Sequence, residues 1–294
     1  MGKILYADKE TIYQNPQIPA NQKVQSGDMN SIKNAINQEG RYTPTTYNSA
    51  NGQFTCQMVG NLEVGDTIQV ILDLTSQDEN EYYNISISID DGATYYDLVD
   101  TKKGFVLNGS DFEYLEIYLK AVFNGTSFVL ISPDRVTNEI TLRLSGVYSA
   151  PSGLNYYYVD TLTEIYEQVG QRLGIGTVTP SGSGSNMSGV KIGEGITKIE
   201  ATGQMQLTNT NTTSAMYFTN FIQRIKPDGS AVQISRSLNY DVLASGSQTA
   251  NMATSLQKVE QNDIIGLRLY KSIASGTCTV DIDARTYVTV KEVR

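Results

Sequence analysis

Short runs in which apolar and polar residues alternate are the feature that most restricts the fold of this chain. Between residues 84 and 89, isoleucine fills every second position and Asn or Ser fills the others. This period of two is typical of a half-buried β-strand. The Asp-Asp-Gly sequence at 90–92 then favours a tight turn. Further runs occupy residues 67–74, 113–123 and 128–131, the last two joined by Asn124-Gly125. We therefore expect a mainly β protein, with a β-sandwich module at residues 41–149.

A second group of strand-like segments follows residue 190. The turn Pro227-Asp228-Gly229-Ser230 suits a hairpin, because proline fixes φ and glycine permits unusual φ values. Eight strand candidates lie at 196–202, 204–208, 215–226, 231–238, 251–259, 264–272, 278–283 and 286–293. Eight is the number of strands in a jelly roll. The sequence thus predicts a C-terminal jelly-roll β-sandwich, a head domain, at residues 191–294.

The N-terminal segment, residues 1–40, is polar and irregular at first and then changes period. Met29, Ile32 and Ile36 fall three and four residues apart, on one face of a helix. Asp28 can accept hydrogen bonds from the first turn, and Gly40 can end the helix. We expect a short helix here whose apolar face packs on a partner.

A helical spacing also occurs between the two β regions. The residues Val159, Leu162, Tyr166, Val169 and Leu173 are spaced three, four, three and four apart. This pattern fits one amphipathic helix lying on its own domain. It also fits a short parallel coiled coil along a symmetry axis, the interpretation that we favour. Residues 174–190 are rich in Gly and Ser and read as a flexible linker, so that 150–190 would be helix plus linker.

The composition argues against several classes of function. The 294 residues include no histidine, which removes His-dependent hydrolysis and argues against most zinc chemistry. The net charge of −9 argues against binding of nucleic acid through a basic surface. No apolar run approaches the roughly 18 residues of a membrane span, and the N-terminus has no signal-peptide core. We expect no cofactor, no metal ion and no membrane partner.

The two cysteines, Cys56 and Cys278, are far apart in the sequence and provide no disulfide framework. We expect both at ordinary half-buried strand positions.

Three pairs of carboxylates are candidate catalytic groups: Asp90/Asp91, Asp281/Asp283 and Glu79/Glu81. A glycosidase needs two carboxylates about 5–10 Å apart in a groove. The first pair lies in a turn sequence, and the second alternates with apolar residues on the solvent face of a strand. We therefore do not expect an enzyme.

The 19 tyrosines include clusters at 82–83, 95–96 and 156–158. Such rings stack on sugars, fill protein interfaces or simply pack within strands, and the sequence leaves these roles open.

Several segments resemble a known family. Residues 221–230, 256–267 and 286–291 resemble the C-terminal jelly roll of phage fibres, related in shape to the TNF/C1q-like trimeric heads. Asn262 stands where that element usually has glycine. Residues 62–68, 107–111 and 122–130 resemble phage tail and fibre β modules, and residues 24–37 are similar to a segment near the virion-proximal end of such fibres.

This resemblance implies a structural virion protein, a homotrimeric fibre or spike on the surface of a tailed bacteriophage, made in the host cytoplasm. The N-terminus would bind capsid or tail proteins, and the head would aid host attachment. The mechanism would be avidity, since three weak sites on one axis bind a surface far more tightly than one site does. The candidate surface-binding loops carry Lys226, Asp228, Ser230, Ser245, Ser247, Ser272 and Ser275. Three alternatives remain: a dedicated carbohydrate-binding protein that recognises host glycan, a polysaccharide-degrading enzyme, and a bacterial adhesin, against which the missing export signal argues.

Overall fold

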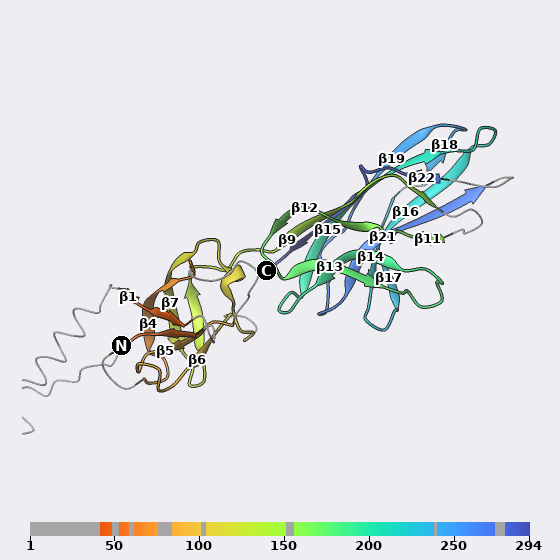
Figure 1. The fold of residues 1–294 in the computed structure, drawn as a ribbon. Coiled ribbons are helices and arrows are strands. Elements are labelled where there is room, and N and C mark those ends of the chain that lie inside the picture. Colours follow the sequence, from red (N-terminus) through yellow and green to blue (C-terminus); the bar gives the residue numbers. More distant parts are fainter. Residues whose placement is uncertain are drawn as a thin grey trace, which may run out of the picture. The chain divides into compact units, whose positions relative to one another are not determined.

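The computed structural model describes residues 42–48, 53–58, 62–75, 84–100, 104–150, 156–237, 240–273 and 280–294. The chain forms two compact units, Met1–Arg135 and Val136–Arg294, and each is described by itself (Figure 1). The prediction of a mainly β protein is confirmed. Among the described residues, a single 3-10 turn at Gly109–Asp111 is the one helical element, and no helix there is long and apolar enough to cross a membrane.

The N-terminal unit is a curled eight-stranded sheet around one apolar core. Its two end strands, β1 and β2, are neighbours in the chain, and β2 also contacts β4, so the sheet bends back on itself. The strands are β1 (Thr43–Pro44), β2 (Thr46–Asn48), β3 (Gln53–Thr55), β4 (Thr67–Asp73), β5 (Ser86–Ser88), β6 (Tyr96–Val99), β7 (Glu116–Phe123) and β8 (Phe128–Ser132). Their order is β1-β4-β7-β8-β6-β5-β3-β2.

The turns expected in this unit are present. Asp91 and Gly92 have φ values of 58° and 90° in the turn between β5 and β6. Gly125 has φ 103° between β7 and β8, where the Asn124 side chain accepts the amides of Thr126 and Ser127 at 2.9 and 2.8 Å. Glycine adopts these left-handed values without the steric cost that a Cβ brings.

The C-terminal unit consists of two sheets. Its strands are β9 (Glu139–Leu144), β10 (Tyr148–Ala150), β11 (Tyr156–Tyr158), β12 (Leu162–Val169), β13 (Leu173–Val178), β14 (Met187–Ile192), β15 (Lys198–Asn209), β16 (Met216–Ile225), β17 (Ala231–Arg236), β18 (Tyr240–Val242), β19 (Ser247–Ala253), β20 (Gln257–Lys258), β21 (Ile264–Ile273), β22 (Val280–Ile282) and β23 (Tyr287–Glu292). The first sheet, here the β9 sheet, runs β10-β22-β15-β23-β9-β12, with β19 and β20 also paired to β15. The second, the β21 sheet, runs β13-β14-β21-β16-β17, with β11 paired to β21 and β18 to β16.

The strand order of this unit is that of a jelly roll. The chain passes from β14 to β15, from β15 to β16 and from β21 to β22, changing sheet each time. Buried residues of both sheets meet in one core, to which Leu142, Val290, Ile222 and Leu267 contribute. The jelly roll is therefore present, but it is larger than expected. It begins with β9 and includes strands β11 to β14, in the region that the sequence assigned to a helix and a linker.

The predicted coiled coil is wrong. Val159, Leu162 and Leu173 are buried in the core of the jelly roll, whereas Tyr166 and Val169 lie exposed on strand β12. The five residues therefore form no common seam. The intervening sequence, with Thr163, Ile165 and Tyr166, is rich in β-branched and aromatic residues, which favour a strand. A spacing of three and four over so short a run did not outweigh that preference and the pairing with β9.

The predicted flexible linker is also wrong, because residues 173–192 form the hairpin β13–β14. Its glycines have a packing role that composition does not reveal. A Cβ at Gly189 would lie 2.2 Å from the carbonyl oxygen of Ile265, so glycine lets β14 approach β21 closely. Small residues here serve sheet packing rather than flexibility.

Some predictions fall on residues outside the described part of the chain. These are the anchor-helix residues Met29, Ile32 and Ile36, together with Ser275, Cys278, the Glu79/Glu81 pair and Tyr82-Tyr83.

Candidate functional site

The predicted surface loops lie at opposite ends of the jelly roll. Residues 226–230 follow the last residue of β16, whereas the turn before β19 lies beside the residues that precede β16. Since β16 has 10 residues, these ends are roughly 33 Å apart. The structure therefore does not bring the loops together into one site.

The turn at 226–230 is the expected hairpin. The amide of Lys226 donates to the carbonyl of Ser230 at 2.9 Å, and the amide of Ser230 donates to the Asp228 carboxylate at 2.8 Å. The hydrogen bonds with Ser230 lower the pKa of Asp228 below its ordinary value. The amide of Ser181, between β13 and β14, donates to the carbonyl of Gly229 at 2.8 Å. This loop is thus held at one edge by a neighbouring hairpin.

The remaining described loop residues gather at the other end. Ser245 has φ 55°, and its amide donates to the carbonyl of Asn211 at 2.9 Å. The Ser247 hydroxyl lies 2.9 Å from that of Thr208 on β15. Ser272 belongs to strand β21, where it pairs with Tyr217, and not to a loop.

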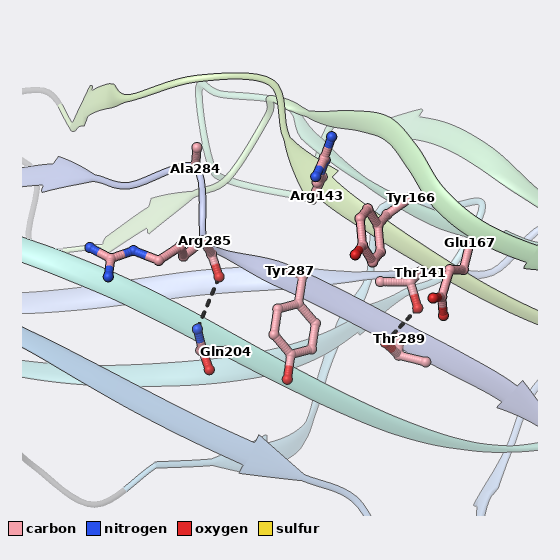
Figure 2. A pocket seen from close by; sticks show the side chains of 9 residues that line it. All are labelled: Thr141, Arg143, Tyr166, Glu167, Gln204, Ala284, Arg285, Tyr287 and Thr289. Carbon is pink, nitrogen blue, oxygen red and sulfur yellow. Dashed lines mark hydrogen bonds between the residues drawn. The ribbon is translucent and has the colours of Figure 1, made fainter.

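A larger candidate surface is the outer face of the β9 sheet, the face turned away from the core. It holds an open depression of about 430 Å³ (Figure 2). The depression is lined by Thr141, Arg143, Tyr166, Glu167, Gln204, Ala284, Arg285, Tyr287 and Thr289. Direct hydrogen bonds hold its floor: the hydroxyls of Thr141 and Thr289 lie 2.8 Å apart, and the Gln204 amide donates to the carbonyl of Arg285 at 3.1 Å.

One wall of this depression is an arginine with two partners. The Arg143 guanidinium lies 4.7 Å from the centroid of the Tyr166 ring and 2.5 Å from the Glu164 carboxylate. The hydrogen bond from Arg143 lowers the pKa of Glu164, so the carboxylate is ionised at neutral pH. The charge of Arg143 is therefore balanced within the same sheet.

Strand β12 also places large side chains in solvent at this edge. Tyr166 is 57% exposed and Val169 is 53% exposed, and Ile165 is exposed between Glu164 and Tyr166. β12 is the terminal strand of its sheet. An unpaired edge with exposed apolar side chains is a site where proteins associate.

The sequence did not single out the residues of this depression other than Tyr166. Residues 139–144 alternate as Glu-Ile-Thr-Leu-Arg-Leu, a signal that predicts a strand with Thr141 and Arg143 on one face. No local signal reveals that this strand pairs with residues 287–291, which come at the other end of the unit.

The described tyrosines of the predicted clusters differ in role: some pack within the protein, and one is exposed at the surface. Tyr96 packs on Phe123 and Phe128, with ring centroids 5.0 and 5.6 Å away. In β11, Tyr157 faces the core and donates to Asp160 at 2.9 Å. Tyr156, on the same strand, is exposed.

Three of the four carboxylates in the described pairs have structural partners. Asp90 accepts from the Ser88 hydroxyl at 2.7 Å and from the Thr94 amide at 2.8 Å, which lowers its pKa and holds the turn. Asp281 accepts from Ser149 at 2.5 Å, and Asp283 from Arg285 at 3.1 Å. Within the residues that the structure describes, no three His, Cys, Asp or Glu side chains cluster as a metal site.

Cys56 is buried and unpaired, at the end of β3. Burial raises the pKa of its thiol to about 11, so the thiolate is scarce at neutral pH.

No family model and no curated protein matches the chain. Among solved structures, two crystal structures of murine APRIL are similar over 54% of this chain and 100% of theirs, at 12% identity and TM-scores of 0.34 and 0.36. The structure of Eiger TNF from S. frugiperda is similar over 54% of this chain and 92% of its own, at 9% identity and a TM-score of 0.33. The assignment of a jelly roll rests on the strand order described above and not on these likenesses.

Proposed function

We propose that the protein is a non-enzymatic structural protein of a virion, a homotrimeric fibre or spike of a tailed bacteriophage that aids attachment to the host surface. In this proposal the outer face of the β9 sheet is the surface through which copies of the chain associate. The attachment to capsid or tail, through residues 1–40, follows from the sequence resemblance alone.

The observation that carries self-association is the exposed strip on β12. Tyr166 and Val169 expose large side chains beside a depression of about 430 Å³ in the same face. A tyrosine ring covers much apolar area at little entropic cost, so it suits an interface. The depression offers a place for such a side chain from a second copy.

The charges on this face fit a second copy of the same surface. Arg143 and Arg285 lie near the depression with Glu164 and Glu167, so both signs occur within one patch. In a trimer, three copies meet around a three-fold axis, and faces that each carry both signs can then be rotated so that opposite charges of neighbouring copies lie adjacent. A partner of strongly one-sided charge would match only half of the patch.

Sedimentation of the full-length chain tests this proposal. The wild-type protein should be a trimer at micromolar concentration. The double variant Tyr166→Glu with Val169→Asp should dissociate, because buried charge without a partner is costly at an interface. Both positions are exposed within one subunit, so the strands should remain folded.

A matched control is Tyr217→Glu, since Tyr217 is equally exposed but lies on the β21 sheet. This variant should remain a trimer. A wild-type monomer would refute self-association, and a trimer that survives the double variant would show that another surface joins the copies.

A further inference from the structure

A second arginine of the C-terminal unit is held among aromatic rings. Arg268 lies on β21 and pairs with Phe221 on β16 and Tyr158 on β11. Its guanidinium carbon is 4.6 Å from the ring centroids of Tyr156 and Phe221 and 5.8 Å from that of Tyr158. Strands β11, β21 and β16 lie side by side (Figure 1). Three rings on neighbouring strands thus fix the orientation of one cation.

This cation has no anionic partner among the described residues. Neither an ion pair nor a hydrogen bond to the Arg268 guanidinium occurs in that part of the chain, and its Nε is enclosed without a partner. The two terminal nitrogens are not among the enclosed atoms, so they reach solvent. Aromatic faces remove water from a guanidinium but leave its charge uncompensated.

The absence of a partner is notable in this chain, which has 31 acidic and 22 basic residues. Other described arginines near carboxylates pair with them, as Arg224 does with Asp263 at 2.6 Å and Arg135 with Asp100 at 2.9 Å. A guanidinium presents its donors as a rigid fork that matches a carboxylate in a bidentate arrangement. The oriented Arg268 guanidinium, whose terminal N–H groups have no partner among the described residues, can therefore bind the carboxylate of a ligand.

The surroundings indicate what carries that carboxylate. Tyr156 is 51% exposed, and its ring centroid lies 4.8 Å from that of Tyr270. The exposed part of such a ring can pack on the C–H groups of a pyranose, while the tyrosine hydroxyls bind sugar hydroxyls. A ligand with a carboxylate and a pyranose ring side by side would contact both features.

We propose that Arg268 and Tyr156 form a binding site for the carboxylate-bearing sugar of an acidic saccharide. This inference rests on the proposed role in host attachment, for which it names the class of receptor. The site lies on the β21 sheet, not on the face proposed for self-association.

Ligand-observed saturation-transfer NMR on the full-length protein tests the site. The probes are trigalacturonate, its methyl ester and triglutamate, which separate a sugar acid from a neutral sugar and from an acidic peptide. We expect saturation transfer to trigalacturonate and little to the other two. Absence of transfer to trigalacturonate at millimolar concentration would overturn the proposal, as would equal binding of the ester or tighter binding of triglutamate.

Variants then locate the site. Arg268→Gln should weaken binding at least about tenfold, because it removes a charged hydrogen-bond donor. Arg268→Lys keeps the charge without the fork and should lie between that variant and the wild type, and Tyr156→Ala should lose several-fold affinity. Lys191→Gln, which removes an equal charge from the same sheet, should stay within about twofold.

Circular dichroism of each variant verifies the fold, and Arg268→Lys maintains the test if Arg268→Gln misfolds. An effect of Lys191→Gln as large as that of Arg268→Gln would refute the site. Sedimentation of the same samples separates the two proposals. A trimer that does not bind would overturn this inference alone, and a monomer that binds would overturn self-association alone.

Discussion

The two outer faces of the jelly roll each hold an arginine against an aromatic ring, but only one of these cations is neutralised. On the β9 sheet, Arg143 contacts Tyr166 and pairs with Glu164 at 2.5 Å. On the β21 sheet, Arg268 contacts Tyr156 and Phe221 and has no carboxylate among the described residues. Similar stacking thus occurs in two electrostatic settings.

The difference separates two kinds of surface. A face whose arginine is paired with a carboxylate of the same sheet attracts no particular anion and suits contact with a surface of mixed charge, such as a second copy. A face with an oriented, unpaired guanidinium favours an anion. The proposed functions of the two sheets follow from this difference.

Both faces depend on the same core, so a core substitution should affect them together. Leu162 of β12 is completely buried in that core. Leu162→Ala should lower the free energy of unfolding of the C-terminal unit by about 2–5 kcal/mol through lost burial and a cavity. Urea unfolding, followed by circular dichroism, measures this loss.

Thr163→Ala provides the control on the same strand. Thr163 is exposed and does not belong to the strip proposed for self-association, so its truncation should change stability by no more than about 0.5 kcal/mol. Equal losses at the two positions would contradict the placement of β12, and with it the outer face described here.

An unpartnered polar group has a different consequence when it faces the core. Asn220 is 0% exposed, alternates with the core residues Phe218 and Ile222, and has no hydrogen-bond partner for either side-chain polar atom. Unlike Arg268, it cannot reach a ligand. Asn220→Leu should therefore raise the free energy of unfolding by about 1–3 kcal/mol, the cost of an unsatisfied buried amide.

Differential scanning calorimetry of the full-length chain checks this prediction. Arg268→Leu is the comparison, because it removes an outward-facing unpartnered group and should affect binding more than the melting temperature. A lower melting temperature for Asn220→Leu would mean that the amide is satisfied in solution.

Much of the fold could be predicted from local patterns. Alternation predicted strands at 67–74 and 113–123, where the structure has β4 at Thr67–Asp73 and β7 at Glu116–Phe123, and turn residues located the hairpins at 90–92, 124–125 and 227–230. Asn262 has φ 69°, a left-handed value that asparagine adopts more readily than most residues other than glycine. These features depend on neighbours in the sequence.

The segment at 156–192 could not be predicted in this way. Its apolar residues have helical spacing, but long-range partners decide the outcome: β11 pairs with β21, and β12 pairs with β9. The candidate sites could not be predicted from local sequence patterns for the same reason. Arg143 meets Tyr166, and Arg268 meets Tyr156, only after strands far apart in the sequence have paired.

The smallest expected effect concerns pH, which should distinguish the two arginines. The pKa of Glu164 is lowered from its ordinary value of 4.5 by the hydrogen bond from Arg143. A lowered pKa in the folded state means that the pair stabilises the protein above pH 4.5 and that this contribution disappears as pH falls through the lowered pKa.

The stability difference between wild type and Glu164→Gln should therefore shrink between pH 6 and pH 3, as measured by urea midpoints. The difference between wild type and Arg268→Gln should stay constant over the same range, because no described carboxylate pairs with Arg268. Other acidic groups titrate in both members of each comparison and cancel. A constant difference for Glu164→Gln, or a pH-dependent one for Arg268→Gln, would remove the distinction between the two faces.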